Sequence, residues 1–173
     1  MQEINNYELA ANKFFSKLAI KSLPIKSWDF YATFFDAMCH SSKVIFMLKN
    51  LAKKNKWSYL ENFNYAILQK KHVIVVTDSN LRIVHVTQNI FQMNGYRPEE
   101  ILGKKPKMFQ GANTCKETSR RIGLAVKNKE PFETIILNYR KDGTSYKCWI
   151  KGEPIVNNSG EVINFIAYEK EVA

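Results

Sequence analysis

The hydrophobic pattern divides the chain near residue 70. Before that point, apolar residues recur every three or four positions, which is the spacing of amphipathic helices. The segments expected to be helical are "SWDFYATFFDAM" at 27–38, "SSKVIFMLKNLAKKNK" at 41–56 and "SYLENFNYAILQKK" at 58–71. In the second of these segments, the expected apolar stripe opposite a lysine-rich face is Val44, Met47, Leu48 and Leu51.

After residue 71 the pattern changes to short alternating runs bounded by turn residues. "HVIVVTD" at 72–78 and "IVHVTQ" at 83–88 predict two strands. "NIFQMNGYRPEEILGKK" predicts short helices, and Pro98 is suited to begin one of them. A longer helix is expected in "TCKETSRRIGLAVKNKE", where Thr114 and Glu117 have the spacing of a capping box.

Three more strand-like runs follow, separated by the turn signals "KDG" and "NNSG". These runs are "PFETIILNYRK", "TSYKCWIKGEPIV" and "EVINFIAYEKEV". The order is strand, strand, helices and then a meander of three strands. This order predicts an α+β domain with one antiparallel sheet.

Composition narrows the class of protein. The net charge of +10 is spread evenly, with ten basic and five acidic residues in the first 70 positions and 16 basic and 11 acidic residues in the rest. This distribution indicates a lysine-rich surface and not a nucleic-acid-binding arm. No run reaches the ~18 apolar residues of a membrane helix, and no signal peptide is recognisable. The cysteines Cys39, Cys115 and Cys148 are too widely spaced for a disulfide framework or a zinc site, so a cytoplasmic protein is expected.

Two segments resemble the PAS domain family, and most closely its light-oxygen-voltage (LOV) branch. "NIFQMNGYRPEEILGKKPKMFQG" is similar to the helical core of that branch and the loop after it, and "LNYRKDGTSYKCWIKGEPIVNNSGEVINFIAYEKEV" is similar to its last three strands. The resemblance covers residues 72–172. It implies a PAS fold, a five-stranded antiparallel sheet with helices on one face, at 71–173. The helical periodicity described above predicts an α-helical N-terminal extension at 1–70, which has no such resemblance.

LOV domains bind flavin mononucleotide (FMN) and form a light-driven thioether with a cysteine in the loop that corresponds to "GKKPKMFQG". The resemblance places Pro106 at that cysteine, so the adduct is not expected here. Two amide positions of the family are kept, as Gln110 and Asn138. The changed positions are Lys105 for asparagine, Lys107 and Gly123 for two phosphate-binding arginines, Cys148 for asparagine and Glu169 for glutamine. Arg120, one helical turn before Gly123, is a further candidate for the phosphate.

These changes alter the expected fit to flavin. An amide donates and accepts hydrogen bonds, whereas an ionised carboxylate only accepts them and a thiol is a weak partner. A buried Glu169 needs a proton or a partner, and Lys105, Lys107 and Asn138 are the candidates. We expect no cofactor, with FMN as the alternative. The candidate positions for binding are Gln110, Asn138, Lys107, Cys148 and Glu169.

Strand alternation assigns side chains to the two faces of the sheet. The residues expected to face inward, toward Met108 and Gln110, are Phe132, Thr134, Ile136, Asn138, Tyr146, Cys148, Ile150, Phe165, Ala167 and Glu169. They either fill the interior or surround a small ligand. The residues expected to face outward are Ile135, Leu137, Tyr139, Trp149, Ile166 and Tyr168. Because a solvated face should be polar, we expect these to form an interface with the helices of residues 27–70 or with a second subunit of a homodimer.

The sequence therefore predicts a sensory PAS module that acts through protein–protein interaction, biased by a pocket ligand or by a partner, without cysteinyl-flavin photochemistry. One alternative is an FMN-binding redox or light sensor that forms no adduct. Another is a dimerisation scaffold without a ligand. No nucleophile with its base, metal cluster or phosphate-binding glycine loop indicates an enzyme, and no motif indicates binding to nucleic acid or a membrane.

Overall fold

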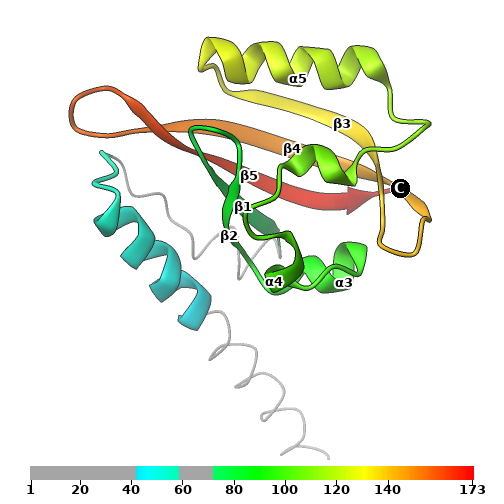
Figure 1. Cartoon of the computed structure of the whole chain (residues 1–173), viewed down its shortest axis with the longest axis horizontal. Helices are drawn as coiled ribbons and strands as arrows, with labels where there is room; N and C mark the ends of the chain where they lie inside the picture. Colours follow the sequence, from blue (N-terminus) through cyan, green and yellow to red (C-terminus); the bar gives the residue numbers. More distant parts are fainter. Residues whose placement is uncertain (1–41, 59–71) are drawn as a thin grey trace, which may run out of the picture. The chain divides into compact units, whose positions relative to one another are not determined.

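The computed structural model describes residues 42–58 and 72–173, and both ranges belong to one compact unit that spans Cys39–Ala173. The helices predicted at 27–38 and in most of 58–71 lie outside the described residues. Within the described part, the fold predicted from the sequence is confirmed: a five-stranded antiparallel sheet carries helices, as Figure 1 shows.

The sheet has the strand order β2-β1-β5-β4-β3, so β5 lies in its centre. The strands are β1 (Val73–Asp78), β2 (Ile83–Val86), β3 (Phe132–Tyr139), β4 (Ser145–Val156) and β5 (Val162–Val172). All pairings are antiparallel, and the "KDG" and "NNSG" turns connect β3 to β4 and β4 to β5 as predicted. The central strand therefore joins the first hairpin to the C-terminal meander.

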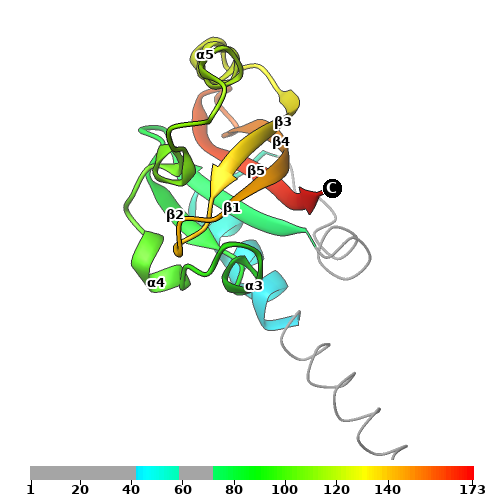
Figure 2. The same ribbon diagram turned by 90° about the vertical axis from the view of Figure 1, so that its right-hand side faces the viewer.

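Four short helical segments separate β2 from β3 and pack on one face of the sheet. They are α3 (Ile90–Asn94), α4 (Pro98–Ile101), the 3-10 helix η2 (Pro106–Phe109) and α5 (Lys116–Asn128). Buried side chains of α3, α4 and η2 form one core with the sheet, and α5 packs against it through Ile122. Figure 2 shows α5 end-on, above β3.

Local chemistry explains where these helices begin and end. Pro98 begins α4, as predicted, and Gly95 ends α3 with a φ of 76°, in the left-handed region that favours glycine. The predicted capping box of α5 is wrong. Its N-cap is Cys115, and the Thr114 hydroxyl instead donates to the Leu137 carbonyl oxygen at 2.7 Å, tying the loop to β3.

A helix over residues 42–54 packs on the opposite face of the sheet. Its buried side chains form a second core with Ile74 and Val76 of β1 and with Ile166 and Tyr168 of β5. The residues that the helix contributes are Val44, Ile45, Leu48 and Ala52, with Leu51 partly buried. The sequence prediction was wrong for Met47, which is 51% exposed, because the buried stripe is rotated toward Ile45. No helix in the two described ranges is long and apolar enough to cross a membrane.

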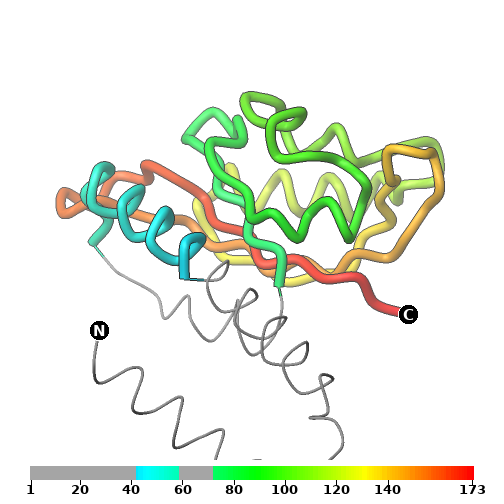
Figure 3. Tube along the Cα trace, turned by 90° about the horizontal axis from the view of Figure 1, so that it is seen from below, coloured from blue at the N-terminus to red at the C-terminus, as the bar shows by residue number. Residues whose placement is uncertain are grey.

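Polar contacts fix the C-terminal end of this helix to the sheet. Asn164 of β5 accepts hydrogen bonds on Oδ1 from Asn55 Nδ2 at 2.9 Å and from Trp57 Nε1 at 3.0 Å. Its own Nδ2 donates to the Thr77 carbonyl oxygen at 2.9 Å. Trp57 also forms a β-bridge with Asn157, so this segment follows the β4–β5 hairpin, beside which the helix lies in Figure 3. Residues 42–58 are thus joined to the sheet by apolar burial and by a network centred on Asn164 of β5.

The packing predicts that substitutions at two neighbouring positions change the free energy of unfolding by very different amounts. Leu48 is fully buried, so Leu48→Ala should lower the free energy of unfolding by about 2–5 kcal/mol, while Met47→Ala should change it by about 0.5 kcal/mol or less. Urea unfolding of both variants measures the difference. Equal, small effects at the two positions would show that this helix does not pack on the sheet.

Candidate functional site

A cavity of about 340 Å³ lies between the inner face of the sheet and the segments η2 and α5. Its volume falls in the range of about 300–1,000 Å³ that is usual for small-molecule sites. Most of its wall is apolar, and the side chains that provide this wall include Val75, Phe109, Ile122, Val126, Phe132, Ile136, Ile150, Phe165 and Ala167. The sequence left open whether side chains fill the interior. The structure shows that they leave a space.

Three small residues line this cavity: Gly123, Gly152 and Ala167. A Cβ at Gly152 would lie 2.4 Å from the Phe132 ring, so the ring occupies the place that a side chain at 152 would need. On α5, a Cβ at Gly123 would meet no atom within 4 Å. Ala167 provides the third small side chain, on the central strand. Larger residues at these positions would reduce the cavity or displace its walls.

Glu169 is the most unusual polar group of this site. Its side chain lines the cavity, the residue is 3% exposed, and Oε2 lies 3.9 Å from Cys148 Sγ. Burial raises the pKa of the Glu169 carboxyl from its ordinary 4.5 to about 7, although the contact with Cys148 acts in the opposite direction. Burial also raises the pKa of the Cys148 thiol far above its ordinary value, so Cys148 stays protonated.

The partners predicted for Glu169 are not those that the structure gives it. Within residues 42–58 and 72–173, no lysine or arginine forms an ion pair with this carboxyl, and its hydrogen-bond partner is the thiol of Cys148. Lys105 and Lys107 also line the cavity, but both are exposed at its rim. Ammonium groups favour such exposed positions because water solvates them there.

Other polar groups of the cavity are provided by different elements. The Gln110 Oε1 atom accepts a hydrogen bond from Ser119 Oγ of α5 at 2.8 Å. Asn138 lines the cavity from β3 and is buried. The Thr77 hydroxyl, on β1, is buried with no hydrogen-bond partner in the described structure. A ligand in the cavity would therefore meet two amides, two hydroxyls and one carboxyl, with two lysines at the rim.

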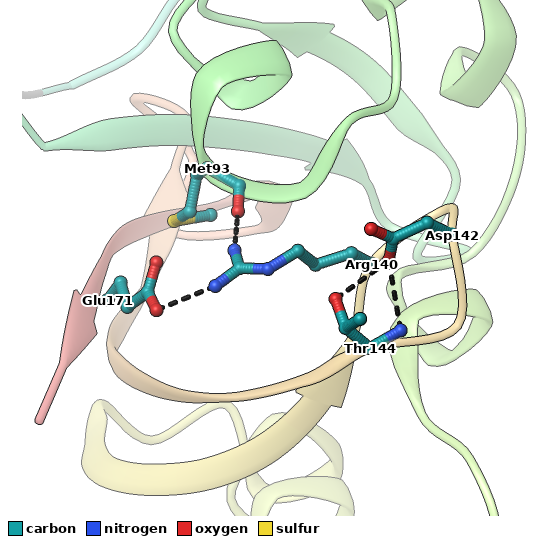
Figure 4. A network of polar contacts seen from close by, with 5 residues as sticks. All are labelled: Met93, Arg140, Asp142, Thr144 and Glu171. Atoms are coloured by element: carbon teal, nitrogen blue, oxygen red, sulfur yellow. Dashed lines mark hydrogen bonds and ion pairs between the residues drawn. The ribbon is translucent and has the colours of Figure 1, made fainter.

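A network of polar contacts holds the β3–β4 hairpin, and with it Asn138, in place (Figure 4). Arg140 donates to the Met93 carbonyl oxygen of α3 and forms a 2.7 Å ion pair with Glu171 of β5. In the turn, Asp142 Oδ1 accepts from Thr144 N at 2.9 Å and from Thr144 Oγ1 at 2.7 Å. The "NYRKDGT" segment thus links β3, β5 and α3 near the buried end of the cavity.

The structure brings together four of the five predicted binding positions. Gln110, Asn138, Lys107 and Glu169 line the same cavity, while Cys148 is fully buried behind Glu169. Arg120, the further candidate for a phosphate, is exposed and does not line the cavity. The sequence reasoning missed Thr77 and Ser119. The alternation of Val73, Val75 and Thr77 along β1 was a signal that could have identified the first of these.

The outer face is only partly covered by helix 42–54. Ile166 and Tyr168 are buried under the helix, and Trp149 is partly buried beside them. Ile135 on β3 is 53% exposed, and Leu137 is half-buried. Tyr139 lies against the loop before α5, where its hydroxyl oxygen accepts a hydrogen bond from the Asn113 backbone N–H at 3.0 Å. The predicted interface thus divides into a covered part on β1 and β5 and a more exposed part on β3.

Comparison with known proteins gives consistent matches. A family profile described as "PAS domain" matches residues 71–172. The chain is 32% identical to Phototropin-2 of Oryza sativa subsp. japonica over 111 residues, which cover 62% of this chain and 12% of that protein. It is also 32% identical to a blue-light photoreceptor of Listeria monocytogenes over 102 residues, which cover 57% of this chain and 40% of that protein. The chain thus spans less than half the length of these two relatives.

Solved structures match the fold as well. A light-oxygen-voltage domain studied with a flavin analogue superimposes with a TM-score of 0.61 at 22% identity, covering 65% of this chain and 86% of that one.

No group of side chains within residues 42–58 and 72–173 has the arrangement of a metal site. The chemistry of the site therefore centres on the cavity and its carboxyl.

The raised pKa of Glu169 predicts how stability depends on pH. Between about pH 4.5 and pH 7, the folded protein keeps the Glu169 proton while the unfolded chain has lost it, so stability falls as pH rises. The loss should reach about 3 kcal/mol above pH 7 and should be absent from Glu169→Gln. Urea unfolding of both proteins across this range measures the difference. A difference between the two curves that does not change with pH would contradict the burial of an unpaired carboxyl.

Proposed function

Because this chain belongs to the PAS domain family, a family of sensory signalling modules, we propose that occupation of the inner cavity shifts the packing of helix 42–54 on the other face of the sheet. The shifted surface would be read by a protein partner or by a second copy of the chain. The relatives that are named as photoreceptors support a sensory role. The signal in this chain is the occupancy of the cavity and not a bond to a cysteine.

The observation that carries this proposal is the two-sided burial of β5. Phe165, Ala167 and Glu169 line the cavity, while Ile166 and Tyr168, which alternate with them, form the core under helix 42–54. A displacement of β5 by a ligand therefore moves the surface on which the helix packs. Packed cores respond to such displacements because they are dense and have few voids to absorb them.

The absence of cysteinyl photochemistry is supported by the composition of the cavity wall. Pro106, at the first position of η2, lines the cavity and has no thiol. Cys115 is exposed at the start of α5. Cys148 is buried, and its raised pKa keeps the thiol protonated. Neither of these cysteines is both reactive and in the cavity.

A second candidate function is an FMN-binding sensor that forms no adduct. The cavity residues fit a planar ring held without a covalent bond, since Gln110 and Asn138 supply amides and Lys107 supplies a cation for an anionic group. Glu169 can donate a hydrogen bond to such a ring only while it carries a proton. The match to a light-oxygen-voltage domain supports this candidate.

The coupling can be tested without a ligand, by filling part of the cavity. Ala167→Leu adds volume next to β5, and we expect it to change amide hydrogen exchange in helix 42–54 by at least about threefold, since local stability governs exchange. Ala112→Leu, in an exposed loop outside the cavity, is the matched control and should leave that exchange unchanged. Identical exchange in all three proteins would refute the coupling.

The flavin candidate makes a separate prediction. If the purified protein carries flavin or takes up added FMN, blue light should form no thioether adduct in the wild type, because no thiol lies at position 106. Any bleaching of the wild type should therefore be photoreduction, which needs an electron donor and is reversed by oxygen. Pro106→Cys should bleach without an added donor and recover in the dark without oxygen. Absorption spectroscopy of both proteins, dark and illuminated, with and without a donor and oxygen, is the measurement. Donor-independent bleaching of the wild type that recovers without oxygen would contradict the absence of an adduct, and failure of FMN to bind would remove this candidate.

A further inference from the structure

Resting on the ligand-binding role proposed above, we propose that the cavity selects an elongated, largely apolar ligand that presents a nitrogen-bound proton to Glu169 and an anionic group to the end near Thr77 and Lys105. The class is thus a zwitterion with an apolar middle. The polar groups of the cavity, their burial and their separation along β5 support this assignment.

The end at Glu169 requires a donor. The carboxyl is buried and faces the cavity, and its only hydrogen-bond partner in the described structure is the Cys148 thiol at 3.9 Å. A thiol is a weak donor, so most of the accepting capacity of the carboxylate is unused. Leaving such a group buried is costly, and an N–H or ammonium group of a ligand would satisfy it with a charge-assisted hydrogen bond.

The opposite end of the cavity has the complementary character. The Thr77 hydroxyl is buried without a partner and lines the cavity. Ile83 pairs with Thr77 and also exchanges backbone hydrogen bonds with the loop before η2, with Gly103 N donating to Ile83 O at 2.8 Å and Ile83 N donating to Lys104 O at 2.9 Å. Lys105 follows directly in this loop and lines the cavity. A positive rim and an unpaired hydroxyl donor both favour an anionic group.

Strand register gives the distance between the two ends. Thr77 pairs with Phe165, and Val73 pairs with Glu169, so the two polar ends are four residues apart along β5. At about 3.3 Å per residue this corresponds to about 13 Å. The wall between them is formed by apolar side chains such as Val75, Phe165 and Ala167. A ligand that satisfies both ends must therefore be long, with an apolar middle.

The charged groups around Glu169 do not replace such a ligand. On β4, Tyr146 and Cys148 are both buried and neutral, because burial raises the pKa of each. On β5, Glu171 is already paired with Arg140. Lys105 and Lys107 are exposed at the rim. Within the described cavity, the buried carboxyl of Glu169 thus has no cationic partner, and a ligand can supply one.

The test uses three simple amphiphiles: ω-aminoundecanoic acid, undecanoic acid, which lacks the ammonium group, and undecylamine, which lacks the carboxylate. Isothermal titration calorimetry on the full chain at about pH 8, where Glu169 is mostly ionised, measures their affinities. We expect the amino acid to bind at least about tenfold more tightly than either relative. Glu169→Gln should remove the preference over undecanoic acid, and Lys105→Gln should reduce the preference over undecylamine.

The control variant is Glu153→Gln, which removes a carboxylate that is paired with Lys151 outside the cavity and should leave all three affinities unchanged. A preference that persists in Glu169→Gln would overturn the inference, as would equal affinities or binding of none of the amphiphiles. These failures are distinct from failure of the proposed coupling, because the Ala167→Leu exchange experiment involves no ligand.

Discussion

The central position of β5 is the constraint on which the rest of the structure depends. A strand sends alternate side chains to opposite faces, and β5 is paired on both edges, so neither its backbone nor its side chains can move alone. Its even positions, Ile166 and Tyr168, form the outer core with helix 42–54. Its odd positions, Phe165, Ala167 and Glu169, form a wall of the cavity. One strand therefore determines both the shape of the site and the surface that surrounds it.

A carboxyl at the cavity end of that strand gives the site its chemistry. Desolvation opposes the charge of Glu169 and outweighs the hydrogen bond from Cys148, which favours that charge. The side chain is therefore balanced between a neutral form, which can both donate and accept, and an ionised form, which only accepts. An amide at this position has no ionised form, so its donors and acceptors would be the same at every pH. The carboxyl, at a position where the resemblance implies an amide, thus has a hydrogen-bonding pattern that depends on pH and on the ligand.

The sequence predicted most of the fold because the relevant signals are local. Alternation along "PFETIILNYRK" and the turn residues of "KDG" and "NNSG" were enough to place the meander, and Pro98 was enough to begin α4. The inward face of β3 and β5 followed from the same alternation, so Asn138 and Glu169 were assigned correctly to one cavity. The resemblance to light-oxygen-voltage domains added the position of the loop at Gln110, which periodicity alone could not place.

The errors arose where distant parts of the chain meet. Thr114 has the spacing of a cap, but the carbonyl of Leu137 lies within reach and accepts its hydroxyl proton. Met47 fits a helical stripe as well as Ile45 does, and only the position of β1 and β5 decides which of the two is buried. Lys105 and Lys107, two of the partners predicted for Glu169, are instead exposed at the rim of the cavity, because an ammonium group keeps its hydration there. Sequence spacing carries no information on which partner is closer in space.

The loop lines the cavity with Pro106 at the position where the resemblance puts the family's cysteine. Proline fits the first position of η2, where no backbone N–H is needed, and the loop still lines the cavity with Lys107, Phe109 and Gln110. The loop therefore lines the cavity without placing a thiol at position 106. A ligand beside this loop would meet non-covalent partners, of which Lys107 and Gln110 are polar. β5 is the element that the cavity and the outer core share, since its alternate side chains line the first and build the second.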